Sequence, residues 1–201
     1  MPGTHSFGEV TFSLADLLVC AYNITLDQFQ GEVVALADGQ MLKVEPEADT
    51  DRQRGYGAIV RTLAVPIGAK LTLGMGGIHV ASYLIMTGAE TNTSDTTPNQ
   101  VRTLDDNAGA TAALPYFGVI GLGITDDGGY AAIGMKACKL DKQPDYTLDG
   151  TANKFNISET AGYAVPISNK LFRRKFYETT TLWTAPANAT QFGQFFSVPA
   201  L

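Results

Sequence analysis

Short runs of alternating apolar and polar residues, interrupted at brief intervals by Gly- and Pro-containing breaks, extend along most of the chain. The first run covers 10–14 and leads into the apolar run 17–22. A side-chain period of two is typical of β-strands, and Thr, Val and Ile, which favour strands, are abundant. The sequence therefore predicts a mainly β protein with about ten strands and one helix.

Length and composition limit what this chain can be. The 201 residues suit one domain with long excursions better than two full domains. Lys and Arg total 14 against 20 Asp and Glu, so the net charge at pH 7 is −6, and the basic surface needed for tight binding to nucleic acid is not expected. With 45% hydrophobic and only 17% charged residues, the chain is expected to fold and to bury part of its surface against partners.

Two turns are expected in the first half of the chain. Asp38-Gly39 lies between the strand-like runs 32–37 and 40–45. This dipeptide predicts either a tight hairpin or a bulge within one long strand. Gly68 divides the segment 56–73 into two runs, which are expected to pair with each other.

One helix and two long loops are also expected. Apolar residues at helical spacing predict a helix over 77–86, and Gly88 is placed to cap its end. The segment 45–55 is rich in charged residues that cannot be buried, so it predicts a protruding loop. The segment 89–114, rich in Thr, Asn and Asp, predicts a long connection.

The second half predicts more strands. Two consecutive hairpins are expected, with their turns at 126–129 and at Asp149-Gly150. Further strand-like runs follow at 161–166, 172–181 and 191–198.

A single basic cluster lies in the run Phe172-Arg-Arg-Lys-Phe176. With a period of two, Arg173 and Lys175 share one face of a strand, and Arg174 lies on the other face with the two phenylalanines. We interpret it as an interface strand. A nucleic-acid stripe is the alternative, although three cations in an acidic chain would give only weak, salt-sensitive contact.

Candidate catalytic and redox groups are sparse. The two histidines, His5 and His79, have no metal-ligand spacing to other donors. His79 and Ser82 resemble a dyad only in spacing, because a helix surface brings such residues together routinely. Cys20 and Cys138 each lie in an apolar run, which predicts buried free thiols rather than a disulfide or a metal site.

No cofactor-binding motif is present either. The glycine clusters lack the residues of a phosphate-binding loop, and Asp126-Asp127 predicts a hairpin turn rather than a calcium loop. We therefore expect no enzyme activity, no cofactor and no metal. No secretory signal and no membrane-spanning segment is recognised, so the protein is expected in the cytosol of the cell that makes it.

Four segments carry a resemblance to a known family. They are GIHVASYLIMTGAET (77–91), PYFGVIGLGI (115–124), GYAAIGMKACKL (129–140) and FNISETAGYAV (155–165). Their hydrophobic pattern and order resemble the major tail tube proteins of long-tailed, siphovirus-like bacteriophages. The resemblance covers roughly 30–165 and includes no short diagnostic motif.

The resemblance implies a β-sandwich or small barrel with one flanking α-helix and two long loops, forming a single tail-tube domain over 1–201. It further implies hexameric rings that stack into the hollow tube through which DNA passes from capsid to host without specific binding. The implied location is the virion tail, after synthesis in the bacterial cytoplasm. The implied partners are further copies of the chain and the tail terminator, distal tail and tape-measure proteins, with no membrane.

The resemblance also suggests residue roles. The loop 45–55 would reach the next ring, which assigns ring stacking to Asp49, Asp51, Arg52 and Arg54. A negative lumen would repel phosphate and let the duplex slide. The acidic residues assigned to that lumen are Glu32, Glu45 and Glu47.

Other classes of protein fit the same sequence. A head-decoration protein or an Hcp-like ring of a secretion tube would share the β-rich pattern. A small-ligand-binding β-barrel would use the apolar residues to line a cavity. An enzyme on a β scaffold would need a carboxylate pair that sequence alone does not reveal.

Overall fold

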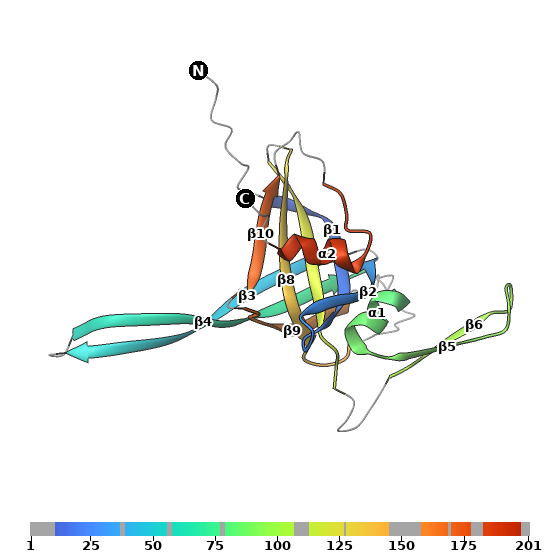
Figure 1. Cartoon of the computed structure of the whole chain (residues 1–201), viewed down its shortest axis with the longest axis horizontal. Coiled ribbons are helices and arrows are strands. Elements are labelled where there is room, and N and C mark those ends of the chain that lie inside the picture. Colours follow the sequence, from blue (N-terminus) through green and yellow to red (C-terminus); the bar gives the residue numbers. More distant parts are fainter. Residues whose placement is uncertain are drawn as a thin grey trace, which may run out of the picture.

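The computed structural model describes residues 11–36, 39–55, 58–76, 79–106, 113–126, 128–144, 158–168, 170–177 and 183–197. This part of the chain contains ten strands and two helices (Figure 1). The strands are β1 (Thr11–Asn23), β2 (Gln28–Ala35), β3 (Gly39–Gly55), β4 (Ala58–Met75), β5 (Glu90–Ser94), β6 (Val101–Asp105), β7 (Phe117–Thr125), β8 (Tyr130–Leu140), β9 (Ser158–Val165) and β10 (Phe172–Tyr177). The helices are α1 (Val80–Thr87) and α2 (Ala189–Phe196), so the mainly β class is confirmed and one more helix is present than predicted.

Eight of the strands form one antiparallel sheet in the order β2-β1-β7-β8-β9-β4-β3, with β10 paired to β8. Along one side of β8, residues 130–135 pair with β10 and residues 137–140 pair with β9. The other side of β8 pairs with β7. β5 and β6 form a separate two-stranded ribbon.

The connection at Gly39 does not join neighbouring strands. β2 pairs with β1, whereas β3 pairs with β4, so β2 and β3 lie at opposite ends of the strand order. Both interpretations of Asp38-Gly39, a hairpin and a bulge, are therefore wrong. The sheet curls so that the start of β3 approaches β1 at this corner, where a Cβ on Gly39 would lie 3.1 Å from the Leu17 Cβ.

The main core lies between the two halves of the curled sheet. Apolar side chains from β1, β7 and β8 pack against those from β4 and β9, which gives the arrangement of a β-sandwich. Met86 of α1 joins the same core and is fully buried. The largest fully buried contributors are Leu17, Val19, Leu71, Leu73, Met86, Phe117, Val119 and Met135.

Helix α2 covers the other face of β1, β7 and β8 and builds a second core (Figure 1). The prediction of a strand over 191–198 is wrong, because Phe192, Phe195 and Phe196 recur at helical spacing and two of them are buried. The Asn188 side chain accepts a hydrogen bond from the Gln191 amide at 2.9 Å and caps the helix.

Helix α1 confirms the prediction at its C-terminal end. Gly88 has a φ of 69°, and its amide donates to the Leu84 carbonyl at 2.9 Å, which is the left-handed cap that favours glycine. Residues 77–78 of the predicted helix lie outside the described residues.

Several predicted loops are strands instead. The segment 45–55 belongs to β3. The predicted pairing of the two runs divided at Gly68 is wrong, because they form one continuous strand, β4, that pairs with β3. The segment 89–114 contains β5 and β6. The hairpin at 126–129 is confirmed as β7–β8, whereas the predicted hairpin at Asp149-Gly150 lies outside the described residues.

Candidate assembly surfaces

The β3–β4 hairpin projects far from the sandwich (Figure 1). Its strands stay paired from Ala48 opposite Pro66 to Gly55 opposite Ala58, beyond Ala69, where the pairing of β4 with β9 ends. The side chains described on this distal part are exposed. This part of the hairpin therefore has no core of its own. An isolated two-stranded ribbon of this kind is only marginally stable in water.

The two faces of the distal hairpin differ in chemistry. Asp49 lies opposite Val65 and Asp51 opposite Leu63, and cross-strand partners share a face. Val65 is 49% exposed and Leu63 54% exposed, so two large aliphatic side chains lie together in solvent on one face. We call these four residues the acidic–aliphatic face. The opposite face carries small or neutral residues and Arg52, which lies opposite Thr62.

The base of the hairpin carries compensated charges. The Lys43 ammonium lies 2.9 Å from the Glu45 carboxylate, and the Lys70 ammonium lies 2.9 Å from that of Glu47. Hydrogen bonds from Lys70 and then Tyr163 hold the pKa of Glu47 below its usual range, and the Glu47 carboxylate correspondingly raises the pKa of Lys70. The negative charge of each of these two glutamates is therefore partly neutralised by a neighbouring lysine.

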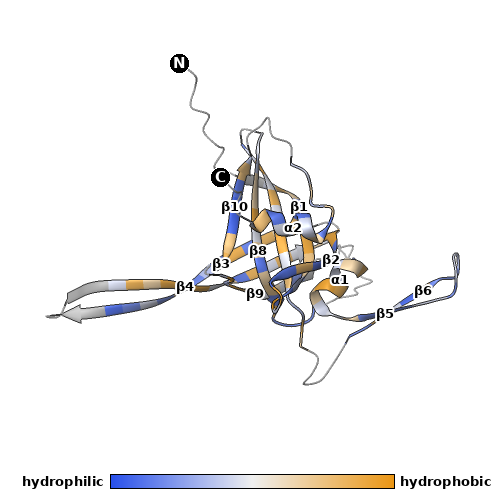
Figure 2. Cartoon of the chain, in the orientation of Figure 1, coloured by the Kyte–Doolittle hydropathy of each residue, from blue (hydrophilic) through white to orange (hydrophobic). Residues whose placement is uncertain are grey.

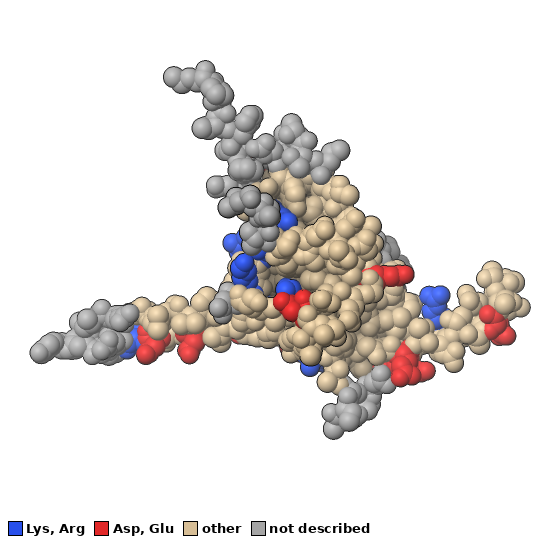
Figure 3. Space-filling view, viewed as in Figure 1, with Lys and Arg blue, Asp and Glu red and all other residues tan. Residues whose placement is uncertain are grey.

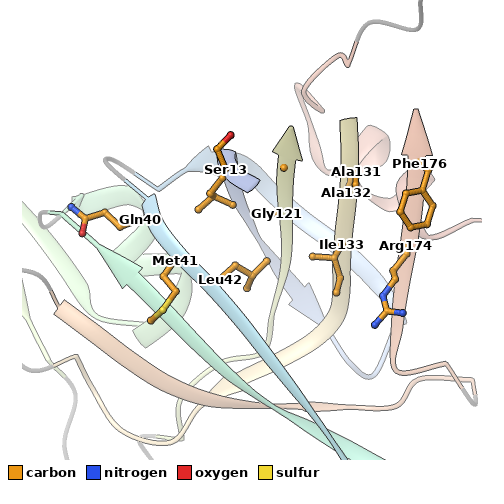
Figure 4. Close-up of a pocket in the computed structure, with 12 residues that line it drawn as sticks. Ser13, Gln40, Met41, Leu42, Gly121, Ala131, Ala132, Ile133, Arg174 and Phe176 are labelled. Atoms are coloured by element: carbon orange, nitrogen blue, oxygen red, sulfur yellow. The ribbon is translucent and has the colours of Figure 1, made fainter. Parts of the chain in front are cut away.

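A groove lies beside β10, between the two halves of the sheet (Figure 4). Its volume is about 550 Å³. Arg174 and Phe176 line it from β10, Gly121 and Ala131 from the adjoining strands, and Met41 from the start of β3. It combines one guanidinium and the polar side chains of Ser13 and Gln40 with small and apolar residues. We call it the β10 groove.

Strand β10 also carries three consecutive basic residues, and blue basic side chains gather at its place in the view of Figure 3. The predicted alternation is confirmed: Arg174 and Phe176 are exposed, whereas Arg173 and Lys175 lie on the half-buried face that packs on α2. An Arg173 Nη donates to the Ser197 carbonyl at 2.7 Å, and the Lys175 Nζ lies 4.8 Å from the centroid of the Phe195 ring. Burial and the charge of Arg173 lower the pKa of Lys175.

The second projecting element is the β5–β6 hairpin, which extends in the opposite direction from β3–β4 (Figure 1). The hairpin is hydrophilic along most of its length (Figure 2). All but Leu104 are exposed, and Val101 is its most exposed large apolar side chain.

The candidate chemical groups are not brought together in the described part of the chain, and His5 lies outside it. The Ser82 hydroxyl donates to the His79 carbonyl at 2.9 Å, which is a bond within the helix and not a catalytic dyad. Cys20 and Cys138 are buried free thiols, as predicted. Among the described residues, no group of His, Cys, Asp and Glu could hold a metal ion. None of the described helices has the length and apolar character needed to cross a membrane.

The structure distributes the predicted site residues over separate places. Asp49, Asp51 and Arg52 lie on the distal hairpin, and Arg54 lies near its tip, where only the backbone is described. Glu45 and Glu47 lie at the hairpin base, and Glu32 is exposed on β2, away from both in the strand order.

Sequence reasoning missed two parts of these surfaces. Leu63 and Val65 were assigned to a strand, but their exposure depends on how far the hairpin projects. The alternation of Val65 with its small neighbours Ala64 and Pro66 is the signal that could have found an aliphatic face. The β10 groove depends on non-local pairing and left no local signal.

The comparisons with known proteins give distant likenesses only. No family model matches the chain, and no curated protein matches it. The chain is similar to a solved structure of the anti-feeding prophage cap, the tube terminating cap, with 10% identity, 88% of this chain and 95% of that chain covered, and a TM-score of 0.43. It is also similar to one of the anti-feeding prophage baseplate, 6-fold symmetrised (12% identity, 88% and 100% covered, TM-score 0.41).

A third similar structure is the sheath/tube terminator of PVC, an extracellular contractile injection system, in its extended state. The identity is 11%, the coverage 83% of this chain and 98% of that chain, and the TM-score 0.44. At such identities and TM-scores these likenesses assign this chain neither a family nor a function.

Proposed function

We propose that this chain is a structural subunit of a phage-like tail tube, in which copies join into hexameric rings and the rings stack. The observation that carries the proposal is the distal β3–β4 hairpin, a projecting ribbon with exposed Leu63 and Val65. A ribbon of this kind needs a partner to cover its apolar side chains. A neighbouring copy supplies that partner wherever the chain assembles with itself.

The sheet supports the same function. β2 and β3 end the strand order, and β10 pairs with β8 alone, so the described sheet has unpaired strand edges. Unpaired edges are a hazard for a monomer but serve as joints in a ring of subunits. In this proposal the distal hairpin reaches the next ring, with Asp49, Asp51, Arg52 and Arg54 at the contact.

Ion pairing differs among the three glutamates and indicates which of them best suits the lumen of the proposed DNA conduit. Glu45 and Glu47 each have a lysine counter-ion, so their repulsion of phosphate is weakened. Glu32 has no ion-pair partner among the residues that the structure describes and remains the strongest lumen candidate of the three. The tail terminator, distal tail and tape-measure proteins are the further partners in the proposed virion tail.

A small-ligand-binding β-barrel is the second candidate function. The β10 groove favours it, because about 550 Å³ is within the range of small-molecule pockets and Arg174 supplies a polar contact. This candidate predicts discrete particles of one or two chains at every concentration.

The test is assembly of the purified chain, followed by light scattering and negative-stain electron microscopy as concentration rises. Rings that stack into hollow tubes support the proposal. Rings that never stack indicate a terminating ring instead, and persistent single chains overturn the proposal in favour of the ligand-binding barrel.

A shortened variant tests the hairpin itself. Residues 49–65 are replaced by Asn-Gly, which joins the paired residues Ala48 and Pro66 through a two-residue turn. Circular dichroism is expected to be that of a folded β protein, while stacking is lost. Tubes of normal length from this variant would remove the hairpin from the stacking contact.

A further inference from the structure

We propose that the β10 groove of one copy receives the acidic–aliphatic face of the β3–β4 hairpin of a second copy. The inference rests on the self-assembly proposed above and names the surface that accepts the hairpin. It assigns Arg174 and Phe176 on the accepting side, and Asp49, Asp51, Leu63 and Val65 on the inserting side.

The accepting side offers one cation beside one exposed aromatic ring. Arg174 and Phe176 are two residues apart on β10 and share a face, and Phe176 is 48% exposed. The Arg174 guanidinium lies 4.7 Å from the centroid of the Phe172 ring, which holds it along the strand. No carboxylate lies within ion-pair distance of it in the described ranges. Figure 4 shows both side chains beside the groove.

The rest of the groove leaves room for aliphatic side chains. Gly123 has no side chain, and Ala131 has only a methyl group. The space beside Gly121 is already filled by Leu42, whose Cδ2 would lie 2.3 Å from a Cβ at that position. Met41 and Ile133 add apolar walls. A Leu or a Val entering such a groove loses contact with water without clashing with a bulky residue, which stabilises the contact.

The inserting side has the complementary pattern. Asp49 and Asp51 have no Lys or Arg within ion-pair distance among the residues whose side chains are described, unlike Glu45 and Glu47 nearer the body. Val65 and Leu63 lie directly opposite them. A carboxylate row beside an aliphatic row matches a guanidinium beside a phenyl ring and an apolar groove, and a guanidinium binds carboxylates particularly well.

One copy cannot satisfy both surfaces, because its own hairpin projects away from its body (Figure 1). The two surfaces are also different, so the contact is head to tail: each copy inserts one hairpin and accepts another. Contacts of this kind propagate through many copies, into a closed ring or an open stack.

Charge exchange between two variants tests this pairing. Arg174→Glu places an acid in the groove opposite the native acids, and Asp49→Lys with Asp51→Lys places bases on the hairpin opposite the native arginine. Each variant alone is expected to lower the assembled fraction about tenfold or more, because like charges meet. A one-to-one mixture is expected to assemble again, since each hairpin then meets a groove of opposite charge.

Matched controls separate charge from position. Thr50→Lys adds a base to the opposite face of the same hairpin, and Arg102→Glu changes an exposed arginine on β6; both are expected to assemble like the unchanged chain. Sedimentation and light scattering measure assembly, and circular dichroism measures folding. Assembly by Arg174→Glu alone, or failure of the mixture of two folded variants, overturns the pairing while the proposed function stands. An unchanged chain that stays monomeric overturns both.

Discussion

The Lys70 ammonium and the Glu47 carboxylate lie 2.9 Å apart on neighbouring strands, at the point where the hairpin leaves the sandwich. The Tyr163 hydroxyl of β9 adds a hydrogen bond to the same carboxylate, and burial raises the pKa of that hydroxyl, with the Glu47 charge as a further cause. Three strands are thus joined by polar contacts where their shared apolar core ends.

Exchanging the charges of Glu47 and Lys70 is expected to show that this ion pair stabilises the fold through the attraction of opposite charges. Glu47→Lys places two ammonium groups together and lowers the free energy of unfolding more than Glu47→Gln does. The double change Glu47→Lys with Lys70→Glu restores the attraction. Urea unfolding at low and high ionic strength measures this, and the difference between the two single variants should shrink as salt rises. Equal effects at both ionic strengths would show that the pair does not act through charge.

Acid sensitivity is expected from Asp27, in the turn between β1 and β2. Its carboxylate pairs with Lys136 and accepts a hydrogen bond from the Tyr22 hydroxyl, and in that order these contacts lower the pKa of Asp27. A carboxyl whose pKa is lowered by folding stabilises the fold above its unfolded pKa, and this stabilisation is lost as the pH falls through the folded pKa.

Asp27→Asn is therefore expected to cost less than about 1 kcal/mol at neutral pH, since the pair is partly exposed, and nothing at strongly acid pH. The free energy of unfolding against pH should be flatter for this variant below about pH 5. Asp141→Asn, which changes another exposed aspartate, is the control. A parallel shift of the whole curve would contradict the assignment to ionisation.

Two glycines are expected to respond oppositely to the same substitution. A Cβ on Gly162 would lie 2.6 Å from the Lys139 carbonyl oxygen, so Gly162→Ala forces β8 and β9 apart and costs about 1–3 kcal/mol. A Cβ on Gly193 would meet only the Phe29 ring at 3.5 Å, within helix α2, so Gly193→Ala stabilises by about 0.5–1 kcal/mol. Thermal unfolding of both variants checks this, and a destabilised Gly193→Ala would show that α2 packs more tightly than described.

Both cysteines are expected to be unreactive while the protein is folded. Burial raises the pKa of the Cys20 thiol to about 11 and raises that of Cys138 as well. Because the thiolate is the reactive form, a thiol reagent at mildly alkaline pH should label neither cysteine in the folded chain and both in denaturant. Rapid labelling of the folded chain would indicate that the sheet opens around one of them.

Local patterns predicted the elements whose contacts are close in sequence. The β7–β8 hairpin follows from the Asp- and Gly-rich turn between its strands. The cap of α1 follows from Gly88, because glycine favours the left-handed conformation at a helix end. The 45–55 segment was predicted as a loop because its charges cannot be buried. A two-stranded ribbon with both faces in solvent also keeps these charged side chains exposed, since it is held by backbone pairing alone. The charged side chains are therefore compatible with a strand.

Non-local contacts explain the other errors. The run ending at Val198 was predicted as a strand from its composition, whereas Phe192 packs into the helix interface with Phe29, 4.9 Å between ring centroids, a contact made across the whole chain. The β10 groove likewise depends on β10 pairing beyond the end of β9. The acidic residues were identified, but the Lys70 counter-ion of Glu47 depends on the strand register, which the sequence does not encode locally. The Lys43 counter-ion of Glu45 lies two residues away on the same strand, so it could have been found from the sequence.

The strand order has a consequence for synthesis on the ribosome. The hairpins β1–β2 and β3–β4 are complete by Met75, yet β7, β8 and β9 lie between them in the sheet. The inner edge of β1 has no partner until β7 is complete at Thr125, and that of β4 has none until β9 is complete at Val165. During most of its synthesis the nascent chain therefore exposes hairpins with unpaired edges and apolar faces, which are prone to aggregate. A protein with so many long-range contacts is also expected to fold slowly.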